Sequence, residues 1–226
     1  LGISERIIKL ANALVGHLKG GLGHVNCLDS VFFAGISGSA VADVAGLGTM
    51  IIPAMTDSGF SKPYATALTA ATSVIGPTIP PSIPMVIYGS TVGVSVAALF
   101  AAGLIPGLLM ALLMMVTNHI ISSKRGYQAH SGKFSWSRFG SAIKEGLLAL
   151  GMPVIIMGGI LGGIFTPTEA AAVAVGYALL VGGLAFKTLN FKVLVSALKR
   201  TVYTTGVSLL LVAMGGILSW VLASEQ

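Results

Sequence analysis

Charged side chains are scarce in this chain of 226 residues, in which Asp, Glu, Lys and Arg together make up 9%. Soluble domains usually carry about 25% charged residues, so this shortage excludes an ordinary soluble domain. Cysteine occurs once, at Cys27, which excludes an internal disulfide framework. Apolar residues make up 54%, the mean hydropathy is +0.92, and apolar segments longer than about 18 residues recur. The composition therefore predicts a multi-pass, all-α membrane protein surrounded by the lipid bilayer.

The net charge of +6 does not indicate a nucleic-acid partner, because the 13 Lys and Arg lie in an N-terminal amphipathic segment and in short stretches between apolar runs. Such a distribution reports membrane topology. If the N-terminal segment is cytoplasmic, all 13 basic residues fall on the cytoplasmic side of the spans predicted below. This agreement with the positive-inside rule supports that orientation.

Residues 1–20 are predicted to form an amphipathic arm. Apolar residues recur there at steps of three and four, with charged residues between them. The segment is too polar to span a bilayer, so we expect a helix over 3–20 that lies at the membrane interface.

Residues 25–55 predict a re-entrant helical hairpin. The polar triplet Ser37-Gly38-Ser39 divides this apolar run into two halves. Each half has about 13 to 16 residues and is roughly 20 to 24 Å long as a helix, whereas the hydrocarbon core is about 30 Å thick. Neither half crosses alone, so we expect the triplet to lie near mid-membrane.

Residues 62–98 predict a helix that is broken within the membrane. The stretch 76–84 reads GPTIPPSIP and contains four of the nine prolines. Proline lacks an N–H and clashes with the preceding turn, so a continuous helix is excluded there. Broken backbone at that depth persists only inside protein or beside a watery cavity, where freed carbonyls can bind a cation. Alone, the stretch is equally consistent with a kinked helix or an external loop that binds nothing.

The rest of the chain predicts further spans. We expect them at 99–121, 147–165, 168–186 and 201–223, with a short interfacial helix at 135–145 and a basic connection at 187–200. Thr166-Pro167-Thr168-Glu169 has the spacing of a capping box, which marks a helix start.

The two interrupted stretches together suggest one ion site. Hydroxyls and carbonyls of the triplet would face the freed carbonyls of 76–84, as in secondary transporters with discontinuous helices. Oxygen ligands suit a hard cation such as Na⁺. Asp43 lies one turn into the second half of the hairpin, and a carboxylate within the membrane is costly unless it faces protein or water.

Three stretches resemble the large membrane subunit of tripartite ATP-independent periplasmic (TRAP) transporters. They are FFAGISGSAVADVAGLGTMIIPAM (32–55), TAATSVIGPTIPPSIPMVIYG (69–89) and MPVIIMGGILGGIFTPTEAAAVAVGYALL (152–180). The resemblance implies a Na⁺-coupled elevator transporter of the bacterial inner membrane that imports an organic acid, such as a C4-dicarboxylate or sialic acid. It also implies a periplasmic substrate-binding protein and a small membrane subunit as partners.

The resemblance also implies roles for segments and residues. Residues 21–98 would belong to the moving transport domain, and 99–226 would be largely scaffold, including the start of a second, inverted repeat. Because the family's large subunit is about twice this long, we expect a fragment that cannot transport alone. The implied Na⁺ ligands are Ser37 with the tip oxygens of Gly38 and Ser39, and the carbonyls of Gly76, Ile79 and Pro81. Asp43 and Ser82 are weaker candidates that would tune the site or face the substrate.

Two alternatives remain open from the sequence. Asp43 could carry a proton, which would make the coupling ion H⁺. Gly35-Ile36-Ser37-Gly38 also matches the GxSG of intramembrane rhomboid proteases, although such chemistry needs a histidine base beside the serine. The histidines after Ser37 are His119 and His130, which are predicted outside the membrane core. We therefore predict a transporter and not an enzyme.

Overall fold

The computed structural model describes residues 3–132 and 135–225, in which every regular element is a helix. Residues 1 and 2 of the predicted arm, and residues 133 and 134 of the basic loop, lie outside the described residues. The chain divides into two compact units, Leu1–Val181 and Gly182–Gln226. The all-α prediction is confirmed. The boundary predicted at residue 98 separates moving from fixed parts, which a division into compact units does not test.

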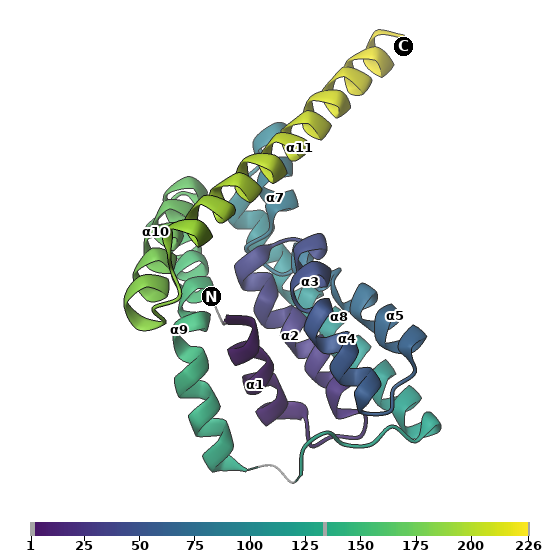
Figure 1. Cartoon of the computed structure of the whole chain (residues 1–226). Coiled ribbons are helices and arrows are strands. Elements are labelled where there is room, and N and C mark those ends of the chain that lie inside the picture. Colours follow the sequence, from purple (N-terminus) through teal and green to yellow (C-terminus); the bar gives the residue numbers. More distant parts are fainter. Residues whose placement is uncertain (1–2, 133–134, 226) are drawn as a thin grey trace. The chain divides into compact units, whose positions relative to one another are not determined.

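The first unit holds ten α-helices among the described residues (Figure 1). They are α1 (Ile3–Val15), α2 (Gly21–Ser37), α3 (Ala40–Gly46), α4 (Gly48–Asp57), α5 (Lys62–Thr72), α6 (Ile75–Thr78), α7 (Ile83–Val92), α8 (Val96–Arg125), α9 (Trp136–Leu161) and α10 (Pro167–Leu180).

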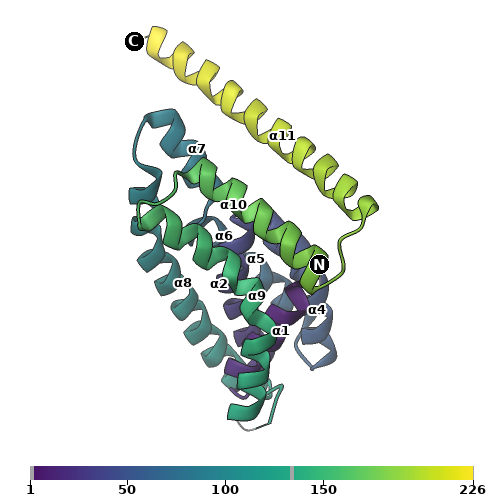
Figure 2. The same cartoon turned by 90° about the vertical axis from the view of Figure 1, so that its left-hand side faces the viewer.

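Helix α2 is the centre of this unit, because it contacts α1, α3, α4, α5, α6, α8 and α9. Glycines on α2 allow this close packing. A Cβ at Gly23 would lie 2.1 Å from the Asn118 side chain of α8, and one at Gly35 would lie 2.7 Å from Pro153 of α9. Figure 2 shows the same helices from the side. The hairpin is therefore anchored to several elements through its first half.

Helix α1 is amphipathic as predicted, with Ile7, Leu10 and Ala11 buried. It ends at Val15, whereas the apolar spacing predicted a helix to residue 20. The chain turns beyond Val15, where the Gly16 carbonyl accepts from the N–H groups of His130 and Ser131, each at 3.0 Å, and Gly20 N–H, its helical donor, donates to the Tyr127 carbonyl at 3.2 Å instead. Tertiary hydrogen bonds thus replace those that would continue the helix.

Helices α8, α9 and α10 agree with the predicted spans, apart from their bounds. Helix α9 joins the predicted interfacial helix and the following span, with a bend of 60° between Lys144 and Gly146. The capping box at the start of α10 is confirmed, since Glu169 N–H donates to the Thr166 hydroxyl at 3.3 Å and the Glu169 carboxylate accepts from Thr166 N–H at 2.8 Å.

Helix α11 (Phe191–Ser224) dominates the second unit and begins ten residues before the predicted span. Asn190 caps it by accepting from Val193 N–H at 2.8 Å. Three of the four basic residues of the predicted connection, Lys192, Lys199 and Arg200, therefore lie on α11, whereas Lys187 precedes it. By length and composition, three helical stretches of the described chain can cross a membrane, or up to five if each of two bent helix pairs counts as one span.

Candidate ion and substrate site

The hairpin tip consists of three residues with distinct backbone roles. Ser37 ends α2, and Gly38 is left-handed with φ of 58°. Its N–H donates to the Ala34 carbonyl at 3.0 Å. Ser39 is extended and caps α3 by accepting from Ala42 N–H at 3.4 Å. The reversal predicted at this triplet therefore occurs between residues 37 and 40.

The helix of 62–92 is broken where the prolines predict it. Helices α5 and α6 precede the break, α7 follows it, and the two sides differ in direction by 41°. Ile79 is extended, with φ of −82° and ψ of 128°, and Ser82 is also extended. Ser82 begins α7 by accepting from Met85 N–H at 3.4 Å. The break is therefore a non-helical stretch between the end of α6 and the capped start of α7.

The hairpin tip and the break lie against each other. Ile83 N–H donates to the Gly38 carbonyl at 3.3 Å. A Cβ on Gly38 would lie 2.5 Å from the Pro81 carbonyl oxygen, and one on Gly76 would lie 3.4 Å from the Ser39 carbonyl oxygen. The structure thus brings the tip, Ser37-Gly38-Ser39, against Gly76 and Pro81, whereas Ile79, which lies between these two in the chain, packs against Gly107 of α8.

Proline removes the hydrogen-bond donors that helix carbonyls in the first part of the break would use. In a helix the carbonyl of residue i pairs with the N–H of residue i+4. The partner of the Gly76 carbonyl would be Pro80, and that of Pro77 would be Pro81, yet proline has no N–H. The Pro77 carbonyl instead accepts from the Ser82 hydroxyl at 2.6 Å. The Gly76 carbonyl keeps no such substitute.

Two further carbonyls lose their donors to other acceptors. Ile83 N–H, the helical partner of Ile79, donates to Gly38. Met85 N–H, the helical partner of Pro81, donates to the hydroxyl that caps α7. Outside the regular helices, no hydrogen bond from a described residue ends on the carbonyls of Gly76, Ile79 or Pro81. Carbonyls without donors are the groups that coordinate ions in broken membrane helices.

The side chains predicted at the site differ in availability. The Ser37 hydroxyl is half-buried and its only described contacts are weak ones to the Ser39 backbone, at 3.4 and 3.5 Å. Ser82 is 1% exposed and its hydroxyl is engaged twice. Asp43 is 2% exposed and its hydrogen-bonding neighbour is Ser30 of α2. Neither Ser82 nor Asp43 is open to a substrate in this structure.

The sequence reasoning missed a group of buried polar residues on α2 and α5. Asn26 donates to Thr69 at 2.7 Å and accepts from Thr72 at 3.3 Å. Asp29 and Ser30 lie on the same face of α2 as Asn26, since residues three and four apart are neighbours on a helix. Asp29 is fully buried. The available signal was a second carboxylate within the apolar run 25–55.

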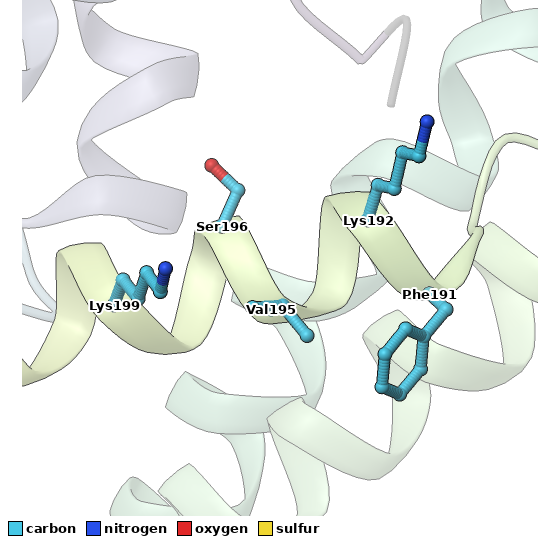
Figure 3. Close-up of a pocket in the computed structure, with 5 residues that line it drawn as sticks. All are labelled: Phe191, Lys192, Val195, Ser196 and Lys199. Atoms are coloured by element: carbon cyan, nitrogen blue, oxygen red, sulfur yellow. The ribbon is translucent and has the colours of Figure 1, made fainter.

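Two hollows lie outside the contact between the hairpin tip and the helix break. One is lined by residues of α11 alone, which project from successive turns of a single helix (Figure 3): Phe191, Lys192, Val195, Ser196 and Lys199. A site that orients a ligand needs groups converging from several sides. Another hollow contains His24 and His119, with ring centroids 5.8 Å apart. Within the described chain, no group of three or more His, Cys, Asp or Glu is placed to hold a metal ion.

Comparison with known proteins agrees with this architecture. The profile of the family described as "Tripartite ATP-independent periplasmic transporter, DctM component" matches residues 1–226. The sialic acid TRAP transporter large permease protein SiaM of Vibrio cholerae serotype O1 is 48% identical over 225 residues, which cover 100% of this chain and 52% of that protein.

Two further relatives also align over this whole chain. The sialic acid TRAP transporter permease protein SiaT of Haemophilus influenzae is 42% identical over 225 residues, and 36% of it is covered. The isethionate TRAP transporter permease protein DctMQ of Oleidesulfovibrio alaskensis is 37% identical over 225 residues, and 35% of it is covered. The chain thus spans about half of the first relative and about a third of the other two. It belongs to the DctM family of TRAP transporter large permeases, which are multi-pass transporters of the bacterial inner membrane and not enzymes.

Proposed function

We propose that the complete protein imports an organic acid in a Na⁺-coupled step, and that this chain supplies one of its ion sites. The observation that carries the proposal is the contact of the hairpin tip with a helix break in which three carbonyls have lost their helical donors. Na⁺ is a hard cation that favours oxygen ligands. The proposed ligands are the oxygens of Ser37, Gly38 and Ser39 and the carbonyls of Gly76, Ile79 and Pro81.

The substrate class rests on the relatives and not on a pocket. Relatives at 48% and 42% identity are named for sialic acid, and one at 37% is named for isethionate. All three names describe organic acids, which supports that class for this protein and leaves C4-dicarboxylates within it. Because Asp43 and Ser82 are buried, we assign Ser82 to holding the break and Asp43 to the interior of the transport domain.

Movement and partners belong to the same proposal. Residues 21–98, with the hairpin and the broken helix, would move as an elevator against a scaffold built largely from 99–226, and α1 would link the two. A periplasmic substrate-binding protein and a small membrane subunit would complete the transporter. The support for these partners is the tripartite, periplasmic character of the family.

The test is Ser37→Ala in the complete protein, reconstituted in proteoliposomes with its partners. Uptake of sialic acid or another organic acid is measured against external Na⁺. Loss of one oxygen from a charged ligand set costs about 1.5 kcal/mol or more, so the half-saturating Na⁺ concentration should rise roughly tenfold. Ser90→Ala, which removes an exposed hydroxyl bonded within α7, should leave it unchanged. An unchanged Na⁺ requirement in Ser37→Ala would remove Ser37 from the site.

Proton coupling through Asp43 is the second candidate. It is favoured by the burial of this carboxylate and by one oxygen of Asp43 that has no hydrogen-bond partner among the described residues. Uptake driven by a pH gradient in Na⁺-free buffer, and abolished in Asp43→Asn, would support it over Na⁺ coupling.

A further inference from the structure

Asp29 is a buried carboxylate without a partner. It lies on α2, it is 0% exposed, and neither of its oxygens has a hydrogen-bond partner in the described chain. A Lys or Arg side chain could neutralise the Asp29 carboxylate, yet neither residue type occurs among the buried residues that the structure describes. An ionised carboxylate in such a place costs several kcal/mol, so Asp29 needs an explanation.

A second buried carboxylate, Asp43, lies on the other half of the hairpin. Asp43 on α3 is close enough to Asp29 for the two side chains to interact electrostatically, and α2 contacts α3 directly. One oxygen of Asp43 is likewise buried and without a hydrogen-bond partner in the described chain. Three buried carboxylate oxygens, carried by two contacting helices of the hairpin, thus have no hydrogen-bond partner in the described chain.

Buried neutral oxygens lie on the same face of α2 as Asp29. Ser30 is the hydrogen-bonding neighbour of Asp43, and Asn26 lies one turn before Asp29 on the same face of α2. Asn26 is held in place by Thr69 and Thr72 of α5. These side chains are all buried. Two carboxylates with neutral oxygens nearby form the kind of hard-oxygen environment that binds alkali cations.

We propose that Asp29 and Asp43 form a second cation site within the hairpin, which takes an ion of the Na⁺ class. Asp29 precedes Ser37 by eight residues, or about 12 Å along α2, so this ion would be distinct from the one at the tip. A proton shared by the pair explains the geometry less well, because a protonated carboxyl donates a hydrogen bond, and the oxygens of Asp29 have no such partner among the described residues.

The inference deepens the proposed Na⁺ coupling, and its experiment measures binding without uptake. The complete purified protein is titrated with NaCl in a choline background, and radioactive Na⁺ bound at saturation is counted together with the Na⁺-dependent rise in Tm. Asp29→Asn keeps the side-chain shape and should bind one Na⁺ fewer per molecule than the wild type. It should also unfold at a higher temperature than the wild type without Na⁺, because a buried repulsion is removed.

The matched control is Asp57→Asn, which neutralises an exposed carboxylate at the end of α4 and should bind as many Na⁺ as the wild type. Ser30→Ala keeps both carboxylates and should weaken Na⁺ binding several-fold, which gives a readout if Asp29→Asn does not accumulate. Equal Na⁺ counts in Asp29→Asn and in the wild type would overturn the inference. Ser37→Ala should raise the Na⁺ concentration needed for half-saturation and leave the Na⁺ count at saturation unchanged, so failure at the tip is distinguishable from failure at Asp29.

Discussion

Gly38 is the residue on which the closeness of the hairpin tip and the helix break most directly depends. Its left-handed backbone ends α2, its carbonyl accepts from Ile83 N–H, and its missing side chain leaves room for the Pro81 carbonyl. Any larger residue must both adopt an unfavourable φ and displace backbone. A glycine needed only for its left-handed φ would not also need the space that the Pro81 carbonyl occupies.

Gly38→Ala should therefore lower both stability and Na⁺ affinity. The left-handed conformation costs a residue with a side chain roughly 1 to 3 kcal/mol, and the added Cβ would also push the tip away from Pro81. The measurement is thermal unfolding of the complete protein at several Na⁺ concentrations.

Gly93→Ala is the matched control, since Gly93 also ends a helix in a left-handed conformation, with φ of 77°, but has nothing within 4 Å of an added Cβ. It should lose stability from backbone strain and keep the Na⁺ response of the wild type. Equal Na⁺ responses in Gly38→Ala and Gly93→Ala would show that the contact with Pro81 does not matter for the ion.

At the scale of elements, the break between α6 and α7 is specified by which N–H groups are missing or diverted. Pro80 leaves the Gly76 carbonyl without its helical donor, while the other free carbonyls lose theirs to neighbouring acceptors. The sequence predicted this break because the effect of proline on its own helix is local. It could not predict which acceptors take the remaining donors, because one of them, Gly38, lies on another element.

Pro80→Ala should weaken Na⁺ binding, because it restores an N–H that can pair with the Gly76 carbonyl. Such a hydrogen bond is worth about 1 kcal/mol, so the Na⁺ Kd should increase roughly fivefold. Pro106→Ala is the control, since Pro106 is inside α8, is exposed and supplies none of the proposed ligands. Titration of both variants with Na⁺ decides the matter, and an unaltered Kd in Pro80→Ala would argue against ligation by Gly76.

Element bounds were predicted less well where tertiary contacts set them. The apolar spacing of the first segment continues to Leu18, yet α1 ends at Val15, and the Gly16 carbonyl just beyond it accepts from His130 and Ser131 N–H, far along the chain. The start of α11 was missed because Lys192, Lys199 and Arg200 were assigned to a loop on account of their charge. Charged residues are common in a helix that extends beyond the bilayer, so charge alone did not mark its first residue.

At the scale of the whole molecule, the distribution of basic residues predicts how the protein is oriented in the membrane. The positive-inside rule places the segment that follows α8 in the cytoplasm and the turn between α9 and α10 in the periplasm. The long apolar helices of the described chain supply the spans but not their direction. Orientation therefore needs a measurement in cells.

Cysteine labelling in cells measures this membrane orientation. Ile164→Cys, at a position that is 72% exposed, should react with a membrane-impermeant maleimide in spheroplasts of intact inner membrane. Ser123→Cys, which is exposed near the end of α8, should react only after the membrane is broken. The native Cys27 is 0% exposed and should give little background. The reverse labelling pattern would refute the orientation.

The sequence by itself determined the membrane class, the two-part hairpin, the broken helix and the capping box, because each depends on composition or on residues within a few positions. Only the tertiary structure decided that Gly38 pairs with Ile83, and that Asp29 and Asp43 are both buried on helices that contact each other. Those contacts depend on how α2 packs against α3 and α6, and packing between elements joins residues whose separation along the chain carries no local signal.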